Sequence, residues 1–193
     1  MPNWVFNNIT VYGDGKKLDK VQNRLKAEYK GVENGDVNFL NFIAPPEENW
    51  EEYNTVGVPG LSTEDTANHP VFDWYDWNCD NWGTKWNACD ASVNLINNNQ
   101  LFIRFETAWS PPRPFMDSFF AYLVELGLEA HYTWEEEQGF GANLSLIDGK
   151  VELTEEWDIP TSHADFEDRD NQCPCEMWQE EMFDDCPKVE VDA

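Results

Sequence analysis

Apolar residues recur at regular spacings through the first thirty positions of the chain. Residues 4–12 alternate between apolar and polar character, which predicts a β-strand with two distinct faces. One face holds Val5, Ile9 and Val11, and the other holds Trp4, Phe6 and Tyr12. After the glycine break at 13–15, apolar positions three or four apart predict an amphipathic helix that stops at Gly31. Its apolar stripe consists of Leu18, Val21, Leu25 and Tyr29.

The same patterns predict further elements along the rest of the chain. Residues 37–43 are apolar on both faces and precede a pair of prolines, so they predict a buried central strand. Residues 100–107 alternate, and a helix is predicted from about Pro114 to Gly127. The inward side chains of this helix are Phe115, Met116, Phe119, Phe120, Leu123 and Leu126. The final predicted strands are 128–134, 142–147 and 151–153, and Asp148-Gly149 predicts a tight hairpin turn between the last two.

The order of these elements predicts the fold. Two strand–helix–strand halves, separated by a long irregular stretch and followed by a hairpin, indicate an α+β ferredoxin-like βαββαβ sandwich. We therefore expect a ferredoxin-like domain at 1–153, with an insertion at about 47–99. Residues 154–193 form the predicted acidic C-terminal extension, in which periodicity is poor.

The predicted insertion contains a tryptophan-rich segment. Four Trp fall within the thirteen residues 74–86, and Asp and Asn stand between them. Aromatic side chains of this kind stack on bases in single-strand binders, but those proteins place basic residues beside the rings. Two interpretations remain open. The segment is either a local aromatic core that holds the insertion on the sheet, or a surface that contacts another protein.

The charge of the chain is extreme and unevenly distributed. The formal net charge is −26, and residues 129–193 hold 20 acidic residues against three basic ones. Solubility, adaptation to high salt and imitation of a polyanionic nucleic acid are the three explanations considered. The abundant aromatic and Asn residues argue against salt adaptation. A sequence pI of about 4.1 with no basic stripe excludes direct nucleic-acid binding.

Motifs for catalysis, metal binding or membrane insertion are weak. Three His (His69, His131 and His163) have no catalytic pattern around them, and no phosphate-binding glycine loop is present, so we expect no enzyme activity and no cofactor. Cys173, Cys175, Cys186 and His163 offer soft ligands without a recognised zinc spacing, and Cys79 and Cys89 are alternatives. The chain has no signal segment and no apolar run of membrane-spanning length. It is therefore predicted to be cytoplasmic, within a host cell, with reduced thiols and no membrane partner.

Four sequence blocks resemble a known family. They are MPNWV at the start, FLNFI at 39–43, NWGTKWNA at 81–88 and TAWSPP at 107–112. In this order they are similar to the YubB-type ferredoxin-like family of phage and plasmid proteins, over residues 1–147. The resemblance implies the fold and a mobile-element setting, and it brings no catalytic residues. A compact, strongly acidic phage protein also resembles the DNA-mimic inhibitors of restriction or CRISPR systems.

These observations together predict a phage-encoded inhibitor of a host defence system, of the anti-CRISPR or anti-restriction type. Its acidic surface would occupy the basic cleft of a host nucleic-acid-binding protein. The alternative is a non-catalytic protein–protein interaction module that uses the Trp-rich insertion, with the charge serving solubility. The predicted partner-binding residues are Glu129, Glu135, Glu136, Glu137, Glu152, Glu155, Glu156, Asp158, Asp165, Glu167, Asp168, Asp170, Glu176, Glu180, Glu181, Asp184 and Asp185.

Overall fold

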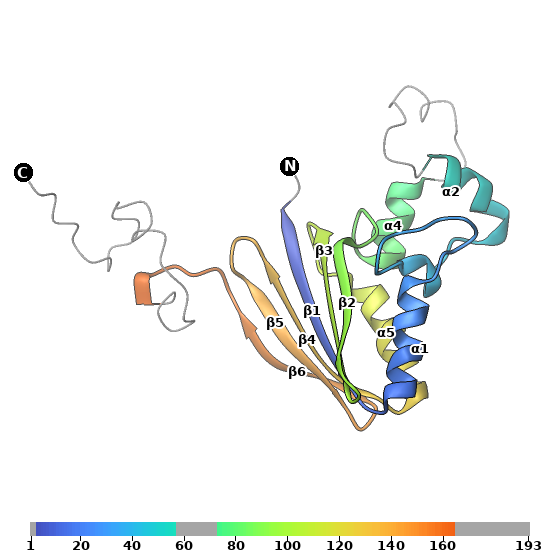
Figure 1. Cartoon of the computed structure of the whole chain (residues 1–193). Helices are drawn as coiled ribbons and strands as arrows, with labels where there is room; N and C mark the ends of the chain where they lie inside the picture. The colour runs from blue at the N-terminus through green and yellow to red at the C-terminus, as the bar shows by residue number, and fades with distance from the viewer. Residues whose placement is uncertain (1–2, 57–72, 165–193) are drawn as a thin grey trace, which may run out of the picture.

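A computed structural model describes residues 3–56 and 73–164 (Figure 1). Its helices gather on one side of a single antiparallel sheet of six strands. The strands are β1 (Trp4–Tyr12), β2 (Cys89–Asn97), β3 (Gln100–Ala108), β4 (Glu129–Glu136), β5 (Gly141–Ile147) and β6 (Lys150–Trp157). The helices are α1 (Gly15–Lys26), α2 (Trp50–Val56), α4 (Trp74–Trp82) and α5 (Arg113–Leu126), with 3-10 turns η1 (Phe39–Asn41) and η2 (Glu47–Asn49). The predicted α+β class is confirmed.

The strands lie in the order β2-β3-β1-β4-β5-β6, and every neighbouring pair is antiparallel. Strands β1 and β2 therefore run parallel to each other with β3 between them, and β3 and β4 do the same with β1 between them. Helices α1 and α5 are the connections within these two split βαβ units. The β5–β6 hairpin then widens the sheet beyond β4 and leaves β6 as its outer edge.

Several predicted elements are confirmed residue by residue. In β1 the two predicted faces are confirmed, and the one that holds Val5, Ile9 and Val11 is the buried face, with these side chains at most 1% exposed. Helix α5 ends where the glycine predicts, because Gly127 adopts a left-handed φ of 61° and its N–H caps the last turn. Asp148 and Gly149 both have positive φ, as a two-residue hairpin turn of the primed type requires.

The predicted strand at 37–43 is wrong. Phe39–Asn41 is a 3-10 turn, and the Asn38 side chain caps it by accepting a hydrogen bond from Leu40 N–H. The Phe39 N–H donates to Asn87 Oδ1 at 2.9 Å, so a side chain takes the place of a neighbouring strand. The segment is apolar on both sides because Phe39 and Leu40 are buried in the core, not because it lies within the sheet.

The second strand of the first strand–helix–strand half is instead β2, which lies inside the stretch predicted as insertion. Its sequence is CDASVNLIN, and Val93 is its only buried residue. The last strand also differs from the prediction. Strand β6 runs from Lys150 to Trp157, so it crosses the predicted boundary at 153/154 and includes Glu155 and Glu156.

Aromatic side chains join the segment between α1 and β2 to the sheet and α5. The Phe39 ring stacks on Phe115 of α5 with ring centroids 4.0 Å apart, and it meets Phe105 and Trp82 edge-on. Trp82 is 1% exposed, and its indole N–H donates to the Ile43 carbonyl at 2.9 Å. Large buried aromatic side chains contribute much of the free energy of folding in a core of this kind.

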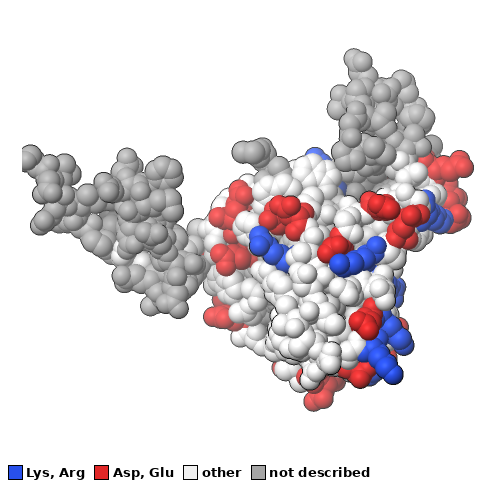
Figure 2. All heavy atoms as spheres, viewed as in Figure 1, with Lys and Arg blue, Asp and Glu red and all other residues white. Residues whose placement is uncertain are grey.

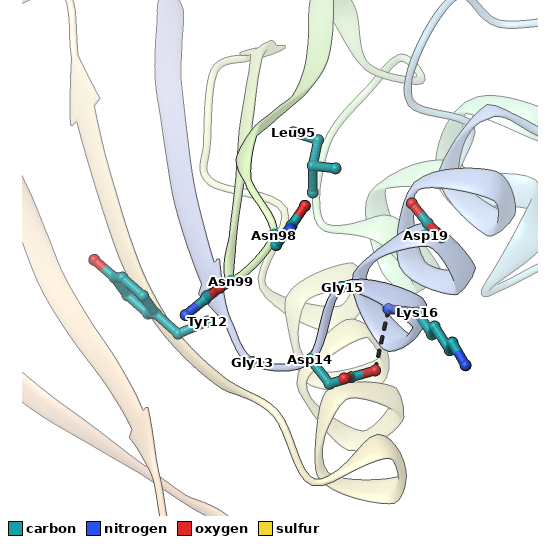
Figure 3. Close-up of a pocket in the computed structure, with 9 residues that line it drawn as sticks. All are labelled: Tyr12, Gly13, Asp14, Gly15, Lys16, Asp19, Leu95, Asn98 and Asn99. Atoms are coloured by element: carbon teal, nitrogen blue, oxygen red, sulfur yellow. Dashed lines mark hydrogen bonds between the residues drawn. The ribbon is translucent and has the colours of Figure 1, made fainter.

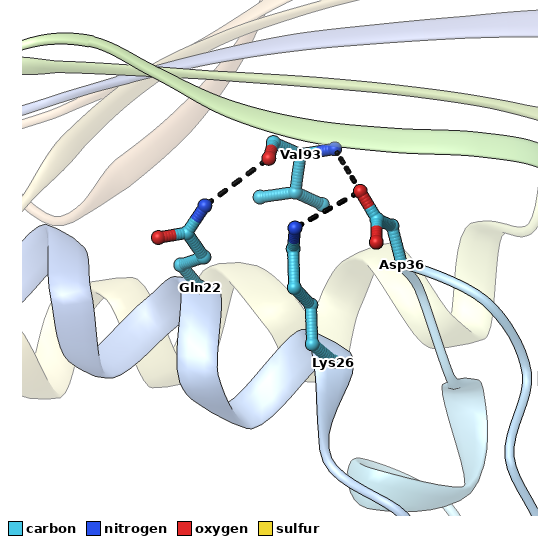
Figure 4. Close-up of polar contacts among 4 residues, drawn as sticks. All are labelled: Gln22, Lys26, Asp36 and Val93. Atoms are coloured by element: carbon cyan, nitrogen blue, oxygen red, sulfur yellow. Dashed lines mark hydrogen bonds and ion pairs between the residues drawn. The ribbon is translucent and has the colours of Figure 1, made fainter.

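A polar clip fastens α1 to the edge strand β2 (Figure 4). Asp36 accepts hydrogen bonds from Lys26 Nζ and from Val93 N–H, both at 3.0 Å, while Gln22 Nε2 donates to the Val93 carbonyl at 3.1 Å. Partial burial alone would raise the pKa of Asp36, but these two hydrogen bonds and the charge of Lys26 outweigh it and lower the pKa.

A second polar network lies inside the core. The Tyr132 hydroxyl donates to Asn7 Oδ1 at 2.7 Å, and Asn7 Nδ2 donates to Thr107 Oγ1 at 3.1 Å and to the Val5 carbonyl at 2.9 Å. Asn7 and Thr107 are fully buried and Tyr132 nearly so. The three residues come from β1, β3 and β4, so the network joins the three central strands.

Candidate acidic interface

The outer edge strand of the sheet, β6 of the β5–β6 hairpin, is exposed along almost its whole length. Every residue of β6 from Lys150 to Glu156 is exposed, including three carboxylates. In Figure 2, acidic side chains gather at the left of the view, where Figure 1 places this hairpin. We call the accessible carboxylates of this region the acidic hairpin surface. Of these, Glu129, Glu137, Glu152, Glu155, Glu156 and Asp158 are exposed, and Glu135 is half-buried.

Strand register decides which side of the sheet each carboxylate faces. Glu135 stands opposite Gly141, Glu152 opposite Ser145, and Glu155 opposite Asn143. Directly opposed residues share a face, so these three carboxylates lie on the side of the sheet away from the helices. Glu129, paired with Tyr12, lies on that side too. Glu156, opposite Ala142, lies on the helix side.

Hydrogen bonds across three strands hold Glu155 in place. Thr133 Oγ1 on β4 donates to Asn143 Oδ1 on β5 at 2.6 Å, and Asn143 Nδ2 donates to Glu155 Oε2 on β6 at 2.9 Å. The Thr154 hydroxyl donates to the Asn143 carbonyl at 3.0 Å beside a register shift in β6. The supporting roles of Thr133 and Asn143 were not predicted from the sequence, because they depend on how β4, β5 and β6 pair.

One predicted contact residue does not belong to the exposed set. Glu136 is 2% exposed, and its Oε2 accepts a hydrogen bond from Gln138 N–H at 2.7 Å within the β4–β5 turn. Alternation along β4 turns Glu136 inward while Glu135 and Glu137 remain accessible. Nine predicted contact residues lie outside the described residues, and they are Asp165, Glu167, Asp168, Asp170, Glu176, Glu180, Glu181, Asp184 and Asp185.

The described residues are strongly acidic without the C-terminal segment. They hold 25 Asp and Glu against ten Lys and Arg, a formal charge of −15. Three ion pairs occur within 3–56 and 73–164, namely Lys26–Asp36, Lys30–Glu47 and Arg104–Glu106. None of these three ion pairs uses Glu129, Glu135, Glu137, Glu152, Glu155 or Glu156.

A shallow hollow lies at the opposite end of α1 from the polar clip (Figure 3). Its volume is about 870 Å³, and it is lined by Tyr12, Gly13, Asp14, Gly15, Lys16, Asp19, Leu95, Asn98 and Asn99. The Asp14 carboxylate already caps α1 by accepting a hydrogen bond from Lys16 N–H at 3.1 Å.

The candidate metal ligands do not form a site in the described part of the chain. No group of three or more His, Cys, Asp or Glu within 3–56 and 73–164 is arranged to hold a metal ion. Of the predicted ligands, Cys173, Cys175 and Cys186 lie outside the described residues, and His163 is buried. Burial raises the pKa of both Cys79 and Cys89, and nearby carboxylates raise that of Cys89 further. Both thiols are therefore protonated at neutral pH.

Comparisons with known proteins bear on the fold. No family model matches the chain, and no curated protein sequence matches it. The crystal structure of protein api92 from Yersinia pseudotuberculosis, assigned to the family DUF1281, is similar with a TM-score of 0.54 and 11% sequence identity. The match covers 83% of this chain and 99% of that one. At this identity the likeness shows a shared fold alone. Within 3–56 and 73–164, no helix is long and apolar enough to cross a bilayer.

Proposed function

We propose that this chain is a phage-encoded inhibitor of a host defence system that acts by imitating DNA. The acidic hairpin surface enters the nucleic-acid-binding cleft of a basic host protein and excludes the natural ligand. The observation that carries this proposal is β6, a strand that presents Glu152, Glu155 and Glu156 to solvent, and no Lys or Arg within 3–56 and 73–164 forms an ion pair with them. A cleft built to neutralise phosphates attracts the same arrangement of charge.

The fixed positions of two carboxylate side chains favour this function over a role in solubility alone. A side chain that is held before binding loses less conformational entropy when the complex forms. Glu155 is held by the Thr133–Asn143 hydrogen bonds, and Glu137 accepts a hydrogen bond from Trp4 N–H at 3.1 Å. Solubility alone requires charge but no fixed position for it.

A ferredoxin-like core and membership of the YubB-type family are part of the same proposal. The strand order β2-β3-β1-β4 with two split βαβ units supports the ferredoxin-like assignment. The family assignment rests on the four sequence blocks, and two of them lie at structurally demanding places. Trp82 is buried in the core, and Trp109 adopts a left-handed φ of 72°.

The second candidate function is a protein-interaction module that uses the Trp-rich segment. Trp82 is buried and Trp77 packs edge-on against it at 5.5 Å between ring centroids, so both serve the core of the insertion. Contact with another protein would then fall to the tryptophans nearer the surface, Trp86 and Trp109. Trp109 is 46% exposed, which is the observation that favours this candidate.

A charge-neutralising triple variant tests the proposed function. Glu152→Gln, Glu155→Gln and Glu156→Gln together remove three negative charges from β6. The matched control, Glu28→Gln, Glu33→Gln and Glu125→Gln, removes three exposed charges elsewhere. Each protein is immobilised, and host proteins are captured at low ionic strength and identified by mass spectrometry. We expect the β6 variant to lose a nucleic-acid-binding protein that the wild type and the control retain.

Two outcomes would contradict the proposal. The first is equal capture of the same protein by the β6 variant and the control. The second is a captured protein that, once purified, binds duplex DNA equally well with and without a stoichiometric amount of this chain.

A further inference from the structure

Three aromatic rings surround the ammonium group of Lys85. Lys85 Nζ lies 4.8 Å from the Trp86 ring centroid, 5.0 Å from that of Trp109 and 5.7 Å from that of Tyr75. Tyr75 belongs to α4, Trp86 to the segment before β2, and Trp109 to the turn after β3. The faces of such rings attract cations, and cages of this kind recognise cationic ligands. We call Tyr75, Trp86 and Trp109 the aromatic box.

The box is held together from outside by hydrogen bonds. The backbone N–H of Trp109 donates to the Asn3 carbonyl at 2.8 Å. The hydroxyl of the next residue, Ser110, donates to the Gly83 carbonyl at 2.5 Å. Tyr75 and Trp109 meet edge-on with centroids 6.0 Å apart. The rings therefore occupy fixed positions and do not depend on Lys85 alone for their arrangement.

Trp109 is strained and exposed at once. Its φ of 72° lies in the left-handed region, which is unfavourable for a residue with a Cβ. The side chain is nevertheless 46% exposed, so burial of the ring does not account for the strain. Unfavourable backbone conformations that persist in this way concentrate at ligand-binding sites.

The Lys85 side chain, which fills the aromatic box, can be replaced there by another cation. Within 3–56 and 73–164, no carboxylate lies within ion-pair distance of Lys85. Asp73 and Asp76, both exposed, flank Tyr75 in the first turn of α4 and supply negative charge at the rim. A lysine that leaves the box regains full hydration, and an arginine from a partner stacks on aromatic faces at least as well as lysine does.

We propose that the aromatic box is a binding site for an arginine side chain of a basic protein partner, and that Lys85 occupies it until the partner arrives. The identity of the partner rests on the function proposed above, whereas the chemistry of the ligand rests on the box itself. Tryptophan, tyrosine and arginine dominate the binding energy of protein interfaces. The box adds one anchored contact to the more diffuse attraction of the acidic hairpin surface.

Titration with short peptides tests the box without knowledge of the partner. The probe is an acetylated Gly-Arg-Gly-Arg-Gly amide, and the neutral control replaces both arginines with citrulline. Indole N–H signals of the full-length chain are followed by NMR, and the Trp109 signal is assigned by its absence from Trp109→Gly. Glycine accepts the left-handed φ at this position, so this variant removes the ring without adding strain.

The variants give opposite expectations. Lys85→Ala empties the box and should tighten binding of the arginine peptide by about threefold to tenfold, while Lys85→Arg should not. Lys150→Ala makes the same change in net charge on β6 and serves as the control for charge alone. Trp109→Gly should weaken binding by about tenfold, whereas Glu152→Gln with Glu155→Gln should leave the Trp109 shift in place.

The proposal is overturned if the citrulline peptide moves the Trp109 signal as far as the arginine peptide does. It is also overturned if Lys85→Ala and Lys150→Ala change the affinity equally. Either result leaves the acidic hairpin surface free to bind its partner. Conversely, a box that binds arginine in a chain that captures no nucleic-acid-binding protein would separate the two proposals.

Discussion

The inner strands of the sheet and its outer edge strand β6 have opposite surfaces. In β1 every second side chain is buried against α1 and α5, and Val5, Asn7 and Val11 have no measurable exposure. In β6 no side chain is buried. Strand β5 still contributes Ala142 and Leu146 to the core, so the change from covered to exposed falls between β5 and β6.

This difference assigns the two properties to different strands: the covered strands stabilise the fold, and β6 carries exposed negative charge. Substitutions in the covered strands disturb a close-packed interior, where the loss of one side chain leaves a cavity. The edge strand β6 contributes little to that interior, so it carries three glutamates at small cost to folding. Charged side chains and an irregular register on an edge strand also discourage pairing with other sheets. Strand β6 is thus held in place by its pairing with β5, while its exposed side chains remain open to a partner.

The largest expected effect comes from a matched pair of truncations in the two regions. Phe39→Ala should lower the free energy of unfolding by about 3–5 kcal/mol, because Phe39 is fully buried against Phe115, Phe105 and Trp82. Leu153→Ala on β6, where the side chain is 58% exposed, should change it by less than about 0.5 kcal/mol. Urea denaturation measures both. Similar losses in the two variants would mean that β6 is part of the core.

A smaller loss is expected where the covered strands hold a buried polar group. Tyr132→Phe removes the hydroxyl that donates to Asn7 Oδ1 and leaves that oxygen without its partner in the core. The free energy of unfolding should fall by about 1–3 kcal/mol. Tyr12→Phe, on the exposed side of the sheet, is the control and should have no measurable effect. An unchanged Tyr132→Phe variant would argue that the network adds nothing to the stability of the central strands.

The polar clip on β2 should have a pH-dependent effect of at most about 1 kcal/mol, since its groups are more than one-third exposed. The pKa of Asp36 is lowered in the folded state, so its contribution is complete above the unfolded value of about 3.9 and disappears as pH falls through the folded value. The stability difference between wild type and Lys26→Met should therefore be full at pH 6 and absent near pH 2. Lys20→Met, an exposed lysine outside the described ion pairs, controls for the loss of a charge. A difference that persists at pH 2 would assign the effect to packing.

The smallest change in stability is expected from the β6 carboxylates themselves. The Glu152→Gln, Glu155→Gln and Glu156→Gln variant should gain at most about 0.5 kcal/mol at low salt, because self-repulsion in an acidic chain decreases. The gain should vanish as salt screens the charges. Thermal unfolding at two ionic strengths measures it. A clear loss of stability would show that these glutamates support the strand rather than serve a partner.

Alternation and turn chemistry made much of the fold predictable. The faces of β1, the Gly127 helix end and the Asp148-Gly149 turn follow from local sequence and match the structure. The sequence did not show that 37–43 is not a strand. Phe39 is buried by distant rings and its N–H is hydrogen-bonded to Asn87, and no local pattern identifies these contacts. Strand β2 does carry an alternating pattern, with Ala91, Val93 and Leu95 on one side and Ser92 and Asn94 on the other, and this pattern was missed within the long stretch assigned as insertion.

The candidate interface shows the same limit. Composition indicated where the carboxylates are concentrated, and alternation along β4 could have shown that Glu136 turns inward. The role of Asn143 required the register of three strands, which sequence spacing does not supply. The aromatic box needed still more, since Tyr75 and Trp109 are brought together only by the folded insertion.

Competition between this chain and duplex DNA for the captured partner tests the central claim most directly. The partner is held on the immobilised chain at low salt, and unlabelled duplex DNA is added in increasing amounts. If the acidic hairpin surface occupies the DNA-binding cleft, the DNA should release the partner completely, and a DNA-binding-deficient variant of the partner should not be captured. Retention of the partner at saturating DNA, in a complex that binds both at once, would contradict the account.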